Sequence, residues 1–242
     1  MFRKLIGVTA LVLALFVAAP PAQAVPIYEG AFLTILDLPD QGTTVGGAFL
    51  VAPARDSVFT PFISFCLQET ESIVKNGVEV FQVVGITTWA EMEMAATGGD
   101  DVTKKDPVDA MTAWIYKKYL EGDWDALGLG AYAGDTPALG DIRGNAVQRA
   151  MWCLEGEDPT GTSGACSYEP AKLVMDAAGL AMPTGLGGVT ALNLVWTRNA
   201  YGYMAGEAAQ DILNPIPEPA SMLLFGSGLA GLAAMVRRRK RR

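Results

Sequence analysis

Both ends of this 242-residue chain carry an apolar run beside basic residues, and this arrangement confines any water-soluble fold to the middle of the sequence. At the start, the basic pair at residues 3–4 precedes an apolar run over residues 5–19 and a small-x-small site at residues 22–24. That order is typical of a secretory signal peptide and predicts cleavage after Ala24. An uncleaved membrane anchor is the alternative, but the run is short for a membrane span.

The carboxyl end has three parts in a fixed order. Pro217-Glu218-Pro219 precedes an apolar run over residues 220–236, and six basic residues end the chain. The run has about the minimum length for a helix that crosses a bilayer. The positive-inside rule places the basic cluster in the cytoplasm. Residues 214–242 are therefore predicted to hold the domain outside the cell through a transient single-pass anchor in the inner membrane.

This tail resembles the PEP-CTERM sorting signal, which combines a Pro-Glu-Pro motif, a transmembrane segment and a basic end. The resemblance implies export in a bacterium with a Gram-negative type of envelope. It also implies processing near the Pro-Glu-Pro by an exosortase. This processing enzyme is therefore an expected partner of the chain. The mature protein is then expected in the cell envelope, at the cell surface or in the extracellular matrix. A plain tail anchor with a Pro-Glu-Pro linker is the alternative.

The composition of the middle part excludes several classes of function. All 26 acidic residues lie within residues 25–219, whereas eight of the 18 basic residues lie in the two ends, which leaves a net charge of −16. Such a surface repels nucleic acid and anionic lipid. The chain has no histidine, which removes Ser-His-Asp and Cys-His catalysis and histidine-ligated metals. We expect no nucleic-acid partner, no metal, no cofactor and no enzymatic activity.

Two hypotheses based on the many carboxylates remain as alternatives. A hydrolase that uses two carboxylates, as glycosidases do, needs no histidine, but no pair stands out in the sequence. Acidic clusters such as Asp123 with Asp125 are candidates for calcium binding, although they lack the ligand spacing of an EF-hand loop. Solvated loop charge is the simpler interpretation of these clusters.

Periodicity predicts an α+β fold in residues 25–213, a single extracellular domain with β-strands at both ends and an inserted helical part. Strand-like segments cover residues 27–36, 47–51, 59–66, 73–75, 78–88 and 189–204, and helix-like segments cover residues 107–121, 141–155 and 169–182. Asn76-Gly77 predicts a hairpin turn. Asp141 or Asn145 is the expected N-cap of the second helix.

The three cysteines favour one disulfide and leave one spare thiol. Cys153 and Cys166 flank a loop rich in Gly, Ser and Pro, so a local bridge between them is the simplest pairing in an oxidising compartment. Pairing of Cys66 with Cys153 is the rival. With the local bridge, Cys66 is left alone after an apolar strand, where a buried core cysteine is the simplest interpretation.

A glutamine in the second predicted helix raises a separate question. Gln148 and Trp152 are four residues apart and therefore share one helix face, with Val147 and Met151 beside them. Cys153 is about 140° round the helix from Gln148, so a partner of Gln148 does not also face Cys153. A glutamine in an apolar patch must satisfy its amide, and a hydrogen bond to a loop carbonyl is the simplest answer.

The segments "FCLQE" and "AVQRAMW", with a tryptophan-bearing helix between them, resemble the thioester domains of bacterial surface adhesins. In that family a cysteine and a glutamine condense into an internal thioester. The resemblance implies a bond between Cys66 and Gln148, shielded from water by Phe65, Met151 and Trp152. It also implies attachment to an amine-bearing target at a surface or in a matrix.

The adhesin hypothesis has a competitor from another class. An exported, acidic domain with several tryptophans is also compatible with a non-covalent structural or polysaccharide-binding role, in which no thioester forms. Labelling of Gln148 by methylamine distinguishes the two hypotheses.

Overall fold

The computed structural model describes residues 25–39, 47–68, 73–91, 105–134, 136–157 and 164–216. Residues Pro26–Pro217 form one compact unit. The predicted signal peptide, the Pro-Glu-Pro motif and the predicted membrane segment lie outside the described residues. Within the described ranges, no helix has both the length and the apolar character that a membrane crossing requires.

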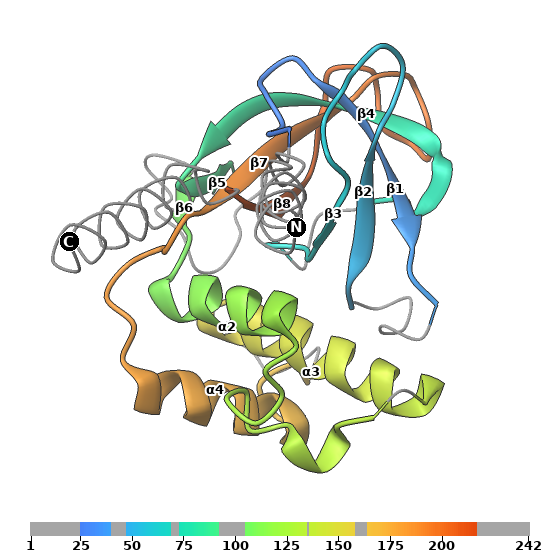
Figure 1. The fold of residues 1–242 in the computed structure, drawn as a ribbon. Coiled ribbons are helices and arrows are strands. Elements are labelled where there is room, and N and C mark those ends of the chain that lie inside the picture. The colour runs from blue at the N-terminus through green and yellow to red at the C-terminus, as the bar shows by residue number, and fades with distance from the viewer. Residues whose placement is uncertain are drawn as a thin grey trace, which may run out of the picture. The chain divides into compact units, whose positions relative to one another are not determined.

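Six strands form an antiparallel sheet in the order β3-β2-β1-β4-β7-β8 (Figure 1). Their bounds are β1 Phe32–Asp37, β2 Phe49–Pro53, β3 Phe62–Ser64, β4 Asn76–Thr87, β7 Val189–Trp196 and β8 Ala208–Pro215. A separate antiparallel pair consists of β5 Trp89–Glu91 and β6 Lys105–Pro107. In β1 and β4 buried residues alternate with more exposed ones over part of the strand, as the two-residue period requires, whereas β7 and β8 are buried on both faces.

The sheet curls until its two edges meet. The residues that follow β3 pair with β8: Cys66 and Ile212 form an antiparallel bridge. The Leu67 N–H donates to the Asp211 carbonyl at 2.9 Å, and the Leu213 N–H donates to the Phe65 carbonyl at 3.1 Å. Backbone groups at these two edges are thereby satisfied by each other rather than by water or another chain.

Three helices are inserted between β6 and β7: α2 Ala110–Glu121, α3 Pro137–Leu154 and α4 Glu169–Ala181, with a short 3₁₀ turn η1 at Gly130–Tyr132. Figure 1 shows them together on one side of the sheet, and α3 contacts both α2 and α4. The carboxylate of Asp109 accepts the Met111 N–H and caps the start of α2. Gly122 ends α2 in a left-handed conformation, as expected from the sequence.

The apolar core has two parts, which use opposite faces of the strands. One cluster is built mainly from alternate strand residues, with Phe49, Phe81 and Trp196 among the largest. The other joins all three helices to the opposite strand faces and includes Phe65 and Tyr116. The Tyr116 hydroxyl donates to the Ile63 carbonyl of β3 at 2.5 Å, which ties α2 to the edge of the sheet.

The predicted α+β class, with strands before and after an inserted helical part, is confirmed, whereas several element boundaries differ. Helix α3 begins at Pro137 rather than at Asp141 or Asn145, because a proline fits the first helical turn, where its missing N–H costs nothing. The predicted hairpin turn at Asn76-Gly77 is wrong: Asn76 is the first residue of β4 and pairs with Leu36 of β1. A long-range pairing thus replaces the local turn.

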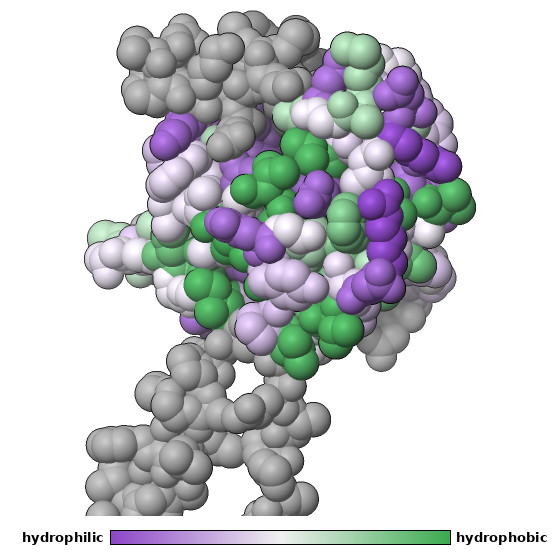
Figure 2. Space-filling view, turned by 90° about the horizontal axis from the view of Figure 1, so that it is seen from above, coloured by the Kyte–Doolittle hydropathy of each residue, from purple (hydrophilic) through white to green (hydrophobic). Residues whose placement is uncertain are grey.

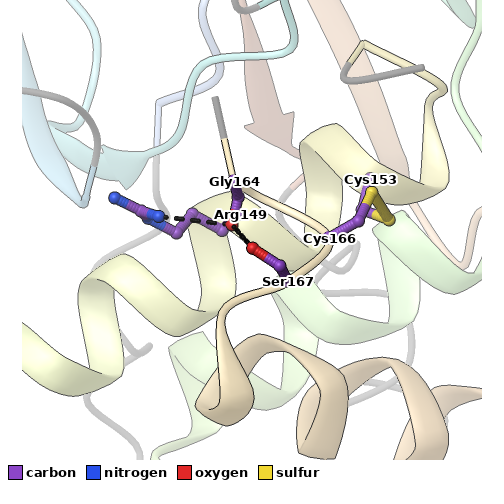
Figure 3. Close-up of a disulfide and its surroundings, with 5 residues drawn as sticks. All are labelled: Arg149, Cys153, Gly164, Cys166 and Ser167. Carbon is purple, nitrogen blue, oxygen red and sulfur yellow. Dashed lines mark hydrogen bonds between the residues drawn. A yellow bond between two sulfur atoms is a disulfide. The ribbon is translucent and has the colours of Figure 1, made fainter. Parts of the chain in front are cut away.

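The disulfide joins Cys153 to Cys166, which is the local pairing that the sequence favoured (Figure 3). It links the last turn of α3 to the segment before α4. Near it, Arg149 Nη1 and Ser167 Oγ both donate to the Gly164 carbonyl, at 3.5 Å and 3.1 Å. The bridge therefore closes a short loop, and hydrogen bonds to Gly164 hold the chain just before Cys166.

Removal of this bridge is expected to destabilise the domain by about 3 kcal/mol, because the unfolded chain regains the entropy of an open loop of this length. The change is the double variant Cys153→Ser with Cys166→Ser, and the measurement is urea unfolding under non-reducing conditions. Wild-type protein treated with reductant should show the same loss, whereas reductant should leave the double variant unchanged. An equal stability of both proteins would contradict the expectation.

Candidate functional site

Cys66 and Gln148, which lie far apart in the sequence, are in direct contact. The Cys66 backbone N–H donates to Gln148 Oε1 at 3.0 Å, and Gln148 Nε2 donates to the Cys66 carbonyl at 2.7 Å. The glutamine carboxamide therefore lies along the backbone of Cys66 with both its polar ends satisfied. The contact is made by the backbone of Cys66, and the cysteine sulfur is two bonds from the Cα atom between those backbone groups.

The chain holds Cys66 in place from both sides. Its own backbone binds Gln148, while the flanking residues bind β8 through the hydrogen bonds that close the sheet. Gln68 Oε1 accepts the Asp211 N–H at 3.0 Å, and the Gln68 carbonyl accepts from Gln210 Nε2. Cys66 thus belongs to a segment whose backbone is fixed on each side by pairing, which preorganises any reaction at this residue.

Helix α3 presents Gln148 to the sheet because the residues on that side of the helix are apolar or small. Val147, Gln148 and Met151 are fully buried, and Trp152 is 5% exposed. Gln148 is the polar member of this group, and it makes two hydrogen bonds to Cys66 instead of the single bond to a loop carbonyl that the simplest interpretation of the sequence suggested.

The thiol of Cys66 is buried and reduced. Cys66 is 6% exposed and is the free cysteine of the chain. Burial raises the pKa of the thiol to about 12, and the positive charge of Lys75 acts in the opposite direction. At neutral pH the sulfur therefore carries its proton, and a reaction at this sulfur has to move that proton to another atom.

The three residues expected to shield the pair occupy both apolar clusters. Trp152 belongs to the cluster that contains Cys66. Phe65 and Met151 belong to the helix-side cluster, in which the Phe65 ring meets the Tyr119 ring edge-on at 4.8 Å. All three are buried, so the contact between Cys66 and Gln148 lies at the boundary between two water-excluding regions.

Sequence reasoning missed a buried polar network beside this pair. The carboxylate of Asp211 accepts from Asn193 Nδ2 at 3.2 Å and from the Leu194 N–H at 3.0 Å. Asn193 Oδ1 accepts in turn from the Thr87 hydroxyl at 2.9 Å. The only signal in the sequence was a group of polar residues beside apolar ones in β7 and β8, a pattern that equally fits a loop.

Within the part of the chain that the structure describes, no group of three or more Cys, Asp or Glu side chains is arranged to hold a metal ion. Asp123, from one of the candidate calcium clusters, instead pairs with Lys118 at 3.0 Å and accepts the Ala126 N–H. Figure 2 shows a face on which the coloured apolar residues lie in small groups between polar ones. The contact between Cys66 and Gln148 is therefore the arrangement with the clearest chemistry.

Comparison with known proteins identifies the end of the chain. Residues 215–240 match the PEP-CTERM protein-sorting motif. The predicted sorting signal is thus confirmed, and the motif implies export, a carboxyl-terminal membrane anchor before processing, and processing by an exosortase. No curated protein and no solved structure matches the chain. The chemistry of the ectodomain therefore has to be argued from its own residues.

Proposed function

We propose that this exosortase-sorted protein is an adhesin-like protein of the cell surface or extracellular matrix, whose ectodomain forms an internal thioester between Cys66 and Gln148 and attaches covalently to amines. The observation that carries this proposal is the pair of hydrogen bonds by which the Gln148 carboxamide and the Cys66 backbone bind each other in a buried region. The residue that carries the spare, reduced thiol and the residue that carries the fully buried carboxamide are 82 positions apart in the chain, and these hydrogen bonds bring them together.

The first step is formation of the thioester. Cys66 Sγ attacks Gln148 Cδ, the C–S bond forms, the C–N bond breaks, and the thiol proton leaves with the amide nitrogen as ammonia. The Cys66 N–H already donates to Gln148 Oε1, so it is positioned to stabilise negative charge that develops on this oxygen. Proximity replaces concentration, which lets a weakly acidic thiol react with an otherwise inert amide.

The second step is attack by an amine. The amine nitrogen bonds to Gln148 Cδ, the C–S bond breaks, and the amine gives a proton to Cys66 Sγ, which leaves a stable amide and a free thiol. Burial of the pair protects the acyl group from water before a target arrives. A domain with a net charge of −16 over residues 25–219 attracts cationic, amine-bearing targets. Because each molecule reacts once, the protein is not an enzyme.

The test is the intact mass of the exported protein, purified in mild detergent, with its two ends located by peptide mapping. The wild-type protein is expected to be lighter by one ammonia than the sequence between those ends, after the disulfide is counted. Cys66→Ala should restore the full mass apart from the substitution itself. Gln82→Ala, which changes a glutamine in β4, is the matched control and should keep the deficit. Methylamine should abolish the deficit and label Gln148 in a peptide map.

A wild-type mass without the deficit, in protein whose Cys66 is reduced and unmodified, would reject the thioester. The contact would then be a structural hydrogen-bond pair, and the non-covalent surface role would stand in its place. A deficit that persists in Cys66→Ala would place the lost ammonia elsewhere in the chain and would reject the assignment to this pair.

A further inference from the structure

Arg143 is a buried arginine for which the described part of the chain supplies no acceptor. It lies in α3, and the whole residue is 6% exposed. Its guanidinium carbon is 4.4 Å from the centroid of the Trp124 ring, and its Nε is buried without a hydrogen-bond partner. Among the residues that the structure describes, none forms a hydrogen bond or an ion pair with it.

The other arginines in the described ranges all have an acceptor. Arg198 binds the Glu79 carboxylate through two nitrogens, at 2.7 Å and 2.8 Å, Arg149 donates to the Gly164 carbonyl, and Arg55 donates to the Thr197 hydroxyl. These three are less buried than Arg143. The most buried of the described arginines is thus the one for which the described residues supply no acceptor, in a domain that has an excess of carboxylates.

Among the described residues, the group recorded against the guanidinium is an aromatic ring and not a carboxylate. Trp124 lies beneath it, and the Tyr119 ring meets the Trp124 ring edge-on at 5.4 Å. Burial raises the pKa of the Tyr119 hydroxyl to about 12, and the charge of Arg143 acts in the opposite direction, which places the cation near this hydroxyl. The nearby carboxylate of Asp123 is engaged with Lys118.

A guanidinium Nε that is buried without an acceptor is costly, because the desolvation of that N–H is repaid only in part by the face of one ring. Its five N–H donors form a planar fork that matches a carboxylate in a bidentate arrangement. The Trp124 ring holds this fork in one plane before a ligand arrives. The arrangement therefore has the properties of a preformed half of an ion pair.

We propose that Arg143, held on Trp124, is a binding site for the carboxylate of an external ligand. The ligand is expected to carry an isolated carboxylate on an otherwise neutral or cationic molecule, because the −16 domain repels polyanions. An acidic sugar in a neutral glycan and the carboxyl terminus of a peptide share this chemistry. The site uses neither Cys66 nor Gln148, so a negative result for the thioester would not affect this proposal.

The experiment follows the Nε–H resonance of Arg143 by NMR in ¹⁵N-labelled full chain in detergent, assigned as the signal that is lost in Arg143→Lys. The probes are sodium glucuronate and N-acetylglycine, and their neutral amides are the ligand controls. At least one carboxylate should give a saturable shift in the millimolar range, and its amide should give none. The probe that shifts the signal distinguishes a sugar source from a peptide source.

Arg143→Met should weaken binding of that probe at least tenfold, as measured by calorimetry, and Arg149→Met is the matched control. Arg149 also lies over an aromatic ring, that of Tyr168 at 5.0 Å, but it already has an acceptor, so its replacement should leave binding unchanged. Because no described residue accepts a hydrogen bond from Arg143, its replacement should leave the melting temperature unchanged or raise it.

Failure of both carboxylates to shift the Arg143 signal would overturn the proposal. Binding that survives Arg143→Met would overturn it as well, because the carboxylate would then bind elsewhere. If Arg143→Met does not fold, the titration of the wild-type resonance decides alone, since it needs no variant at this position beyond the assignment with lysine.

Discussion

Replacement of Gln148 by alanine is expected to lower the free energy of unfolding by about 4 kcal/mol. The N–H and the carbonyl of Cys66 would each lose a partner in a buried place, at a cost of about 1–3 kcal/mol for each group. The shorter side chain would also leave a cavity beside Val147 and Met151, which are fully buried. Urea unfolding of Cys66→Ala, with and without Gln148→Ala, measures this effect, since no thioester can form in either protein.

The matched control is Arg149→Ala, one position along the same helix, in the same Cys66→Ala background. Arg149 is half-buried and makes one long hydrogen bond at 3.5 Å, so its loss should cost less than about 1 kcal/mol. Equal costs for the two substitutions would show that the hydrogen bonds between Gln148 and Cys66 contribute nothing specific to stability.

The stability of the domain is expected to fall as the pH rises from about 4.5 to about 7, because of Glu155 at the end of α3. Burial raises the pKa of Glu155 to about 7 from an ordinary value of 4.5, and the charges of Asp106 and Asp109 act in the same direction. Between these two values the folded protein binds more protons than the unfolded chain, so rising pH favours unfolding. A shift of this size corresponds to a loss of up to roughly 3 kcal/mol.

Glu155→Gln should remove most of this loss, because the neutral amide still accepts the Asp109 N–H, which now donates to Glu155 Oε1 at 3.0 Å. The variant should be more stable than the wild type at pH 8 and similar to it at pH 4. Asp106 contributes a smaller dependence of the same sign, because burial raises its pKa to about 6. Glu169→Gln, at an exposed position in α4, should leave the profile unchanged. Parallel profiles of Glu155→Gln and wild type would contradict the assignment.

Local signals in the sequence predicted the ends of the helices better than their starts. Gly122 ends α2 as expected, and the third predicted helix coincides with α4 to within one residue. The predicted start of α2 at residue 107 is wrong, because Pro107 belongs to β6 and Asp109 caps the helix. These ends depend on caps and on a left-handed glycine, which act over a few neighbouring residues and can therefore be recognised without knowledge of the fold.

Strand β8 and the true role of Asn76 could not be predicted in this way. The side chains of Gln210, Asp211 and Asn214 make β8 look like a loop, yet all three are buried. They are acceptable there because Gln68, Asn193 and Thr190 bind them from other parts of the chain. Such compensation is visible only when the partners are placed in three dimensions.

The candidate site likewise has one part that the sequence could predict and one part that it could not. The spare thiol and the glutamine were predicted as a pair from a resemblance between short motifs, and Trp152 was assigned to the glutamine side by helix periodicity. The form of the contact was not predictable, because it depends on the backbone of Cys66 rather than on its side chain. The unpaired state of Arg143 was equally invisible, since a sequence shows which charges exist but not which of them meet.

The closure of the curled sheet survives processing only if the cut lies downstream of β8. Ser64 Oγ donates to the Leu213 carbonyl across 149 positions of the chain, and β8 ends at Pro215, just before Pro217. The segment that holds Cys66 therefore completes its pairing only after nearly the whole ectodomain has been exported. A cut a few residues upstream of the Pro-Glu-Pro would remove part of β8, which pairs with Cys66 through Ile212. Only a few peptide bonds therefore separate the sorting motif from the strand that the site needs.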